Sequence, residues 1–213
     1  MLVQHEVREY LNDTAFQYKP GQYEYYARLA LDQALIAFEE SNYGIGALAV
    51  VTTTDSVSEF PARNAMITGL GITDHAETRA LQDIKSNKPP GKTYHKDENE
   101  WTAALPEGIS VFGTLEPCPM CDCTLTNAGA KLSVSTVLDG NLVEEEGFKR
   151  SDGAENAIGE KGRLKPKIWG WIQGASGLTF ELLETEDDKL VDLSRRIFEE
   201  TREDIDAALA KRS

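Results

Sequence analysis

The chain has 213 residues, 40% of them hydrophobic, and this length and composition suit a single globular domain. The 36 acidic residues outnumber the 22 basic ones, and the net charge of −14 argues against long-range attraction of nucleic acids and favours a small substrate. No apolar run is as long as a membrane span and the N-terminus does not resemble a secretory signal, so a soluble cytoplasmic protein is expected.

Helices and strands alternate in the first part of the chain. Over residues 21–40, apolar residues recur at spacings of three and four, which predicts an amphipathic helix. Residues 47–53 are apolar and β-branched and predict a buried strand, and a second strand is predicted near residues 57–62. Another helix follows, with Thr73 or Asp74 as its expected N-cap.

The same alternation continues after a long polar segment. Residues 86–108 are rich in Pro, Gly and charge and predict a surface insertion. Residues 109–115 and 132–138 predict strands, and a helix is expected to open between Pro117 and Cys121. This alternation indicates α/β layers within one domain.

The last third of the chain has weaker patterns. Residues 141–165 are interpreted as mainly loop, and apolar residues at helical spacing predict a terminal helix over about 187–211. Trp169 and Trp171 are interpreted as core residues, with stacking on a flat ligand as the alternative.

Two short segments carry the candidate chemistry. The first, TDHAETRAL over residues 73–81, contains His-x-Glu, which is weak evidence alone. The second, TLEPCPMC over residues 114–121, contains Cys-x-x-Cys, which alone would also fit a redox site or half of a structural zinc site. Together, at predicted helix starts, they match the H-x-E…P-C-x-x-C signature of zinc deaminases.

The residue types suit a metal site with an open position. His75, Cys118 and Cys121 are the expected ligands of Zn²⁺, and a fourth tetrahedral position would remain for water, whose pKa zinc lowers toward neutrality. Helix N-termini favour ionised thiolates. Glu77 is the expected catalytic residue, because from two positions after the histidine it can move protons without binding the metal.

A closed structural zinc site is the main alternative from the residues themselves. Such a site normally has four ligands, so Cys123, His95 or His5 would have to join. Cys123 follows Cys121 by only two residues, which is poor geometry for a shared metal. A thioredoxin-like dithiol would leave the His-Ala-Glu segment unexplained.

From about Tyr23 to Gly140 the sequence resembles the cytidine/deoxycytidylate deaminase superfamily. The Gly-Ile-Gly-Ala-Leu, His-Ala-Glu and Pro-Cys-Pro-Met-Cys segments are most similar to the branch of guanine, fungal-type cytosine and tRNA adenosine deaminases. The resemblance implies a three-layer α/β/α sandwich with a mixed central sheet, a homodimer, and deamination of a nucleobase, nucleoside or similar small heterocycle, with guanine-like purines favoured. An RNA-editing deaminase or its partner subunit, and a non-catalytic zinc-binding interaction protein, are the alternatives.

The resemblance also implies substrate contacts. Asn64 lies eleven residues before His75, where the family places an asparagine that hydrogen-bonds the base. The backbone amide of Ala76 is expected to bind a base carbonyl, and carbonyl groups near Glu116 to accept from the leaving amine. We expect one deaminase domain over residues 1–213, with a recognisable core over 23–140, the insertion and a C-terminal extension over 141–213.

Overall fold

The computed structural model describes residues 2–15, 17–69, 71, 73–95, 105–137 and 177–210. The loop predicted over 141–165 and the two core tryptophans predicted at Trp169 and Trp171 lie outside these residues. The described helices are α1 (Leu2–Asp13), α2 (Tyr23–Glu39), α3 (Ala76–Lys85), α4 (Pro119–Asn127) and α7 (Asp188–Ala210), and the strands are β1 (Gly46–Thr52), β2 (Ser56–Arg63), β3 (Lys92–His95), β4 (Gly108–Leu115), β5 (Leu132–Val137) and β6 (Thr179–Leu182).

The strands form one mixed, open sheet in the order β3-β2-β1-β4-β5-β6. β1 pairs antiparallel with β2 and β4, so that Ala49 lies between Phe60 and Val111. β3 extends the sheet antiparallel to β2, whereas β4, β5 and β6 run parallel. This arrangement confirms the predicted mixed sheet.

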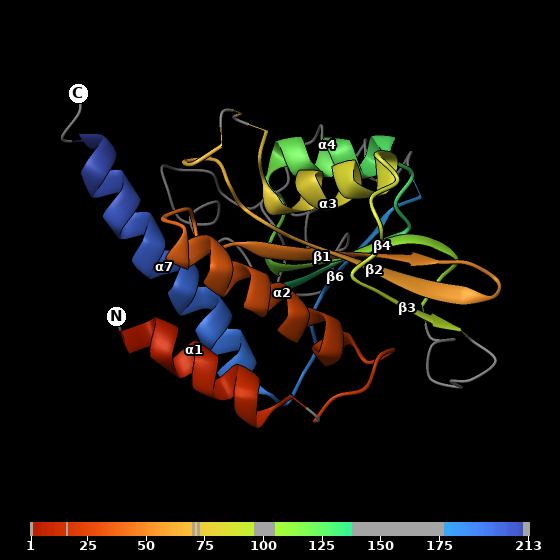
Figure 1. Cartoon of the computed structure of the whole chain (residues 1–213), viewed down its shortest axis with the longest axis horizontal. Helices are drawn as coiled ribbons and strands as arrows, with labels where there is room; N and C mark the ends of the chain where they lie inside the picture. The colour runs from red at the N-terminus through yellow and green to blue at the C-terminus, as the bar shows by residue number, and fades with distance from the viewer. Residues whose placement is uncertain are drawn as a thin grey trace, which may run out of the picture.

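Helices cover both faces of the sheet, which confirms the predicted three-layer α/β/α sandwich. Figure 1 shows α3 and α4 side by side on one face and α1, α2 and α7 on the other. Each face has its own apolar core. No helix within the described ranges combines the length and apolar character needed to cross a membrane.

Helix α2 packs very closely on β1 at Gly46. A Cβ atom at this position would lie 2.0 Å from the backbone oxygen of Ala30 and 2.5 Å from the backbone nitrogen of Ala34. Only glycine permits such an approach. Gly46 thus sets the distance between α2 and the strand at the centre of the sheet.

Three elements were not predicted. α1 buries Val3, Val7, Tyr10 and Leu11, which are spaced as on one helical face, so the periodic signal was present. β3 lies within the segment predicted as a surface insertion, and its residues are largely exposed. It forms because it pairs with β2, an interaction that its own polar sequence does not reveal. β6 has four residues, too few for a clear pattern.

Candidate active site

The three predicted metal ligands meet at the N-termini of α3 and α4. Nδ1 of His75 lies 3.5 Å from Sγ of Cys118 and 3.5 Å from Sγ of Cys121, and the two sulfur atoms are 3.5 Å apart. The side chain of Cys121 is fully buried, and the other two are partly exposed. Two segments that are distant in sequence therefore form one compact donor group.

Each of the two segments presents its first ligand from a helix N-cap. His75 precedes α3 with φ −74° and ψ 152°, and Cys118 precedes α4 with φ −67° and ψ 166°. Pro119 occupies the first turn of α4, where a missing N–H costs no intrahelical bond. Cys121 follows one turn later and so points to the same end of the helix.

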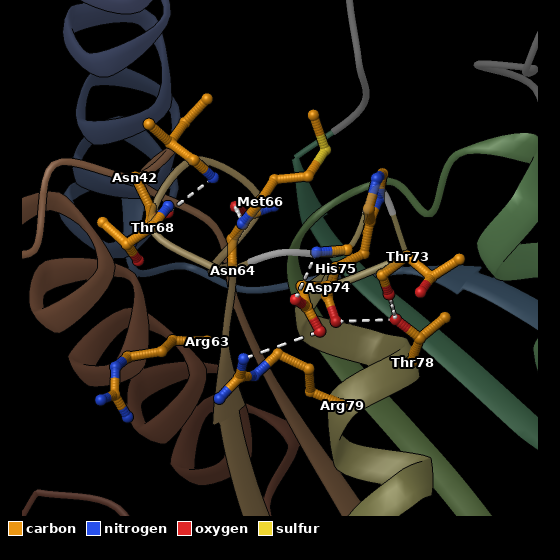
Figure 2. Close-up of polar contacts among 12 residues, drawn as sticks. Asn42, Arg63, Asn64, Met66, Thr68, Thr73, Asp74, His75, Thr78 and Arg79 are labelled. Carbon is orange, nitrogen blue, oxygen red and sulfur yellow. Dashed lines mark hydrogen bonds and ion pairs between the residues drawn. The ribbon is translucent and has the colours of Figure 1, made fainter.

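The predicted N-cap at Thr73 or Asp74 is wrong, because His75 is the N-cap of α3. The Asp74 carboxylate instead accepts a hydrogen bond from the backbone N–H of Gly71 at 3.3 Å. The hydroxyl of Thr78 donates to the backbone oxygens of Thr73 and His75 and holds this start of the helix (Figure 2). This role of Thr78 was not predicted from the sequence. Its position three residues after His75 was the one feature that could have indicated it.

The donor group fits a zinc ion. Zn–S bonds of about 2.3 Å and Zn–N bonds of about 2.0–2.1 Å at tetrahedral angles place the sulfurs about 3.8 Å apart and sulfur and nitrogen about 3.6 Å apart. The observed separations of 3.5 Å agree to within a few tenths of an ångström. All three histidines and all three cysteines lie in the described residues, and Cys123, His5 and His95 are not part of the group. A structural site closed by one of these three residues is therefore not formed.

The three donor side chains differ in how firmly they hold their protons. The hydrogen bond from Cys121, with help from His75, lowers the pKa of the Cys118 thiol to about 4. The same hydrogen bond and burial raise the pKa of Cys121, and the contact with Cys118 raises the pKa of His75. Cys118 is thus the readily ionised thiol, and metal binding must displace the protons that His75 and Cys121 hold.

Glu77 lies beside this donor group without being part of it. Its side chain is 4% exposed, and its Oε2 atom is 3.4 Å from Sγ of Cys121. Burial raises the pKa of its carboxyl group. A buried carboxyl group with a raised pKa therefore lies next to the candidate metal ligands.

Asn64 directly follows β2, and the turn that it begins holds it in place. Its backbone N–H donates to the oxygen of Ile45 at 2.9 Å, and its Oδ1 accepts from the N–H of Met66 at 3.0 Å (Figure 2). The side chain is 1% exposed, and no described residue accepts a hydrogen bond from its Nδ2 group. Ala65 N–H donates to the backbone oxygen of Asp74 at 2.9 Å, so this turn is attached directly to the residue before His75.

The other two predicted contacts flank the same donor group. Ala76 is the first residue of α3, and its N–H belongs to the first-turn amides that have no intrahelical acceptor. Glu116 follows β4 two residues before Cys118, and its backbone N–H donates to the oxygen of Val137 at 2.8 Å. The substrate-binding roles of these residues stay predictions.

Comparisons with known proteins agree with this geometry. The family model for the cytidine and deoxycytidylate deaminase zinc-binding region matches residues 20–136, which include both ligand segments. No curated protein gives a significant match.

Several solved structures share the fold. One, from a study of A-to-I editing by tRNA:A34 deaminases, is 19% identical, with 82% of this chain and 99% of that chain covered and a TM-score of 0.51. A protein in complex with 2,6-diaminopurine is 17% identical, with coverages of 86% and 83% and a TM-score of 0.55. A mutant of that protein in complex with 8-azaguanine is 16% identical, with coverages of 83% and 86% and a TM-score of 0.54. The chain belongs to the cytidine and deoxycytidylate deaminase family, and His75, Cys118 and Cys121 are positioned to hold a metal ion in its zinc-binding region.

Proposed function

We propose that this protein is a zinc-dependent hydrolytic deaminase of a small N-heterocycle, either a free nucleobase or a nucleoside. The observation that carries this proposal is the position of Glu77, a buried carboxyl 3.4 Å from Sγ of Cys121 and outside the ligand set. A purely structural zinc site has no need of a buried acid beside its ligands, because burying such a group without a role is costly.

Glu77 is proposed to move the protons of the reaction. Zinc, when bound, supplies the Lewis acidity that brings the pKa of a water molecule toward neutrality. Glu77 would take one proton from a water molecule and transfer it to a ring nitrogen of the substrate. It would then take the remaining proton from the hydroxyl group added to the ring carbon and deliver it to the departing amine. The net reaction consumes one water, replaces the C–NH₂ group by C=O and releases ammonia. Burial supports this cycle because a raised pKa lets the carboxyl hold a proton between the steps.

Asn64, Ala76 and Glu116 are proposed to orient the substrate. Because Oδ1 of Asn64 is occupied by Met66 N–H, its Nδ2 group is left as a hydrogen-bond donor for a ring carbonyl or ring nitrogen. The N–H of Ala76 would supply a second donor, and carbonyl groups near Glu116 would accept from the exocyclic amine. This pattern suits an amidine with a neighbouring carbonyl, as in guanine and cytosine.

A guanine-like purine is the favoured substrate. The Pro-Cys-Pro-Met-Cys form resembles that of guanine deaminases, and a protein of the same fold was solved with 2,6-diaminopurine and, as a mutant, with 8-azaguanine. A tRNA substrate is less favoured, because a net charge of −14 opposes the phosphate contacts that supply much of RNA affinity.

The test is ammonia release by purified, zinc-loaded protein from a panel of purines, pyrimidines, pterins and triazines. We expect turnover of guanine above that of cytosine. Glu77→Gln should lower turnover by a factor of about 100 to 10,000 with unchanged zinc content, because it removes the proton carrier and leaves the ligands in place.

Glu59→Gln is the matched control. Glu59 is also a buried glutamate, 4% exposed like Glu77, but it packs against α2 on the opposite face of the sheet, so its variant should keep wild-type turnover. If Glu77→Gln deaminates guanine at the wild-type rate, the proposed mechanism is wrong. Absence of ammonia from the whole panel, together with salt-dependent tRNA binding and inosine formation, would instead favour an RNA-editing enzyme. Light scattering would test the predicted homodimer.

A further inference from the structure

The side chain of Asn42 holds the loop that follows Asn64. Asn42 is fully buried, and its Oδ1 accepts hydrogen bonds from the backbone N–H groups of Ile67 at 2.9 Å and Thr68 at 3.0 Å. Its Nδ2 donates to Oγ1 of Thr68 at 2.9 Å (Figure 2). One carboxamide group therefore joins two segments about 25 residues apart in the sequence.

The backbone of Asn42 is itself fixed by the C-terminus of α2. Ser41 N–H donates to the oxygen of Phe38 and Asn42 N–H to the oxygen of Ala37, both at 2.9 Å, and Ser41 has φ 62°. This pair of bonds around a left-handed residue is a Schellman cap, which stops the helix in a defined geometry. Asn42 thus projects from a rigid helix end into the loop.

The loop depends on two asparagine side chains in succession. Asn64 Oδ1 takes the N–H of Met66, and Asn42 Oδ1 takes the next two amides along the chain. Because Oδ1 of Asn64 is bound to Met66, the position of Met66 decides where the Nδ2 group of Asn64 points. Asn42 fixes that position, since it holds the residue directly after Met66.

We propose that Asn42 is a positioning residue for substrate binding, which acts by holding the loop so that the Nδ2 group of Asn64 faces the substrate. This inference rests on the proposed function, in which Asn64 donates a hydrogen bond to the heterocycle. Asn42 is not one of the candidate metal ligands, and its side chain bonds to the loop and to the backbone oxygen of Glu40, not to α3 or α4. Its loss should therefore weaken substrate binding and leave the metal in place.

The test is steady-state deamination of guanine by Asn42→Ala and Asn64→Ala, singly and together. Asn42→Ala should lower kcat/KM about tenfold, mainly through a higher KM, at unchanged zinc content. In the Asn64→Ala background the same change should have little further effect, because the two residues act through one contact. Asn42→Asp keeps an acceptor for both loop amides and should restore KM to within about threefold of wild type.

Asp187→Ala is the structural control. Its carboxylate also accepts several hydrogen bonds, from the hydroxyls of Tyr10 and Tyr18 and the N–H of Leu190, but at the start of α7. This variant should be less stable than the wild type. Its KM, measured well below its unfolding temperature, should equal that of the wild type. Should Asn42→Ala not fold, Thr68→Ala at an exposed position removes one contact of Asn42, and we expect a KM rise of about twofold to threefold that is absent in the Asn64→Ala background.

The outcomes separate the two proposals. If Asn64→Ala leaves KM unchanged while the wild type deaminates guanine, the proposed substrate contact fails and the role of Asn42 fails with it. If Asn64→Ala raises KM but Asn42→Ala changes KM no more than Asp187→Ala does, only the positioning role is overturned. The positioning role would also be overturned if the effects of Asn42→Ala and Asn64→Ala on kcat/KM, expressed as free energies, were fully additive in the double variant.

Discussion

The buried carboxyl of Glu59 should make the stability of the fold decrease as pH rises. Glu59 lies on β2 opposite Lys92 of β3 and is 4% exposed. Tyr25 and Tyr26 of α2 and Tyr94 of β3 surround it, and the hydroxyls of Tyr25 and Tyr94 are 2.6 Å apart. Burial raises the pKa of Glu59 to about 7, although the positive charge of Lys92 opposes the rise.

The sign and size of the effect follow from this pKa. Because the pKa in the folded protein exceeds the ordinary value of 4.5, the contribution of Glu59 to stability is fully present below pH 4.5 and is lost as pH rises through about 7. The pKa in the folded protein exceeds the ordinary value by about 2.5. At about 1.4 kcal/mol for one pKa unit, this difference corresponds to a loss of about 3 kcal/mol of unfolding free energy by about pH 8. Glutamine is neutral at every pH, so Glu59→Gln escapes this loss.

Urea unfolding of both proteins at about pH 5 and about pH 8, at equal zinc concentration, measures the difference. The free energy of unfolding of Glu59→Gln, relative to that of the wild type, should rise by about 2–3 kcal/mol from the lower to the higher pH. Glu107→Gln, at an exposed position, is the control. Its free energy of unfolding relative to the wild type should change by less than about 0.5 kcal/mol between the two pH values. If the difference in unfolding free energy between Glu59→Gln and the wild type is equal at both pH values, Glu59 is charged in the folded protein at both. That result would refute the reasoning.

Three further variants test the packing and the helix ends, each by its free energy of unfolding in urea. Gly46→Ala should destabilise by about 3 kcal/mol or more, because its Cβ would lie 2.0 Å from the oxygen of Ala30, and a neutral result would contradict the close packing of α2. Ser41→Gly should stabilise by about 1 kcal/mol, since Ser41 has φ 62°, and destabilisation would argue against the Schellman cap. Asp187→Ala should cost about 2–3 kcal/mol, because it removes the acceptor of Leu190 N–H and of two tyrosine hydroxyls, and a loss below about 0.5 kcal/mol would contradict these bonds.

Local patterns predict much of this molecule. The spacing of apolar residues over 21–40 predicts α2, and the β-branched run over 47–53 predicts β1, because each pattern reflects the face that an element buries. The ligand set was predictable for a chemical reason: one imidazole and two thiols at helix starts suit an open zinc site, and the structure brings them within 3.5 Å of one another.

Features that depend on distant contacts were not predictable. Glu59 has the sequence context of an exposed charge, and its burial arises only because α2 places tyrosines over that end of the sheet. Asn42 follows a helix as many turn asparagines do, and its bonds to Ile67 and Thr68 exist only in the folded chain. Likewise β3 has a polar sequence that forms a strand through pairing with β2.

The most direct test of the central claim measures zinc content and ammonia release on the same preparations of wild type and Glu77→Gln. The arrangement of His75, Cys118 and Cys121 around a metal, with Glu77 beside them, predicts equal zinc content in both proteins and ammonia release from guanine by the wild type alone. Equal ammonia release by both proteins, or a folded wild type that does not bind zinc, would contradict the account.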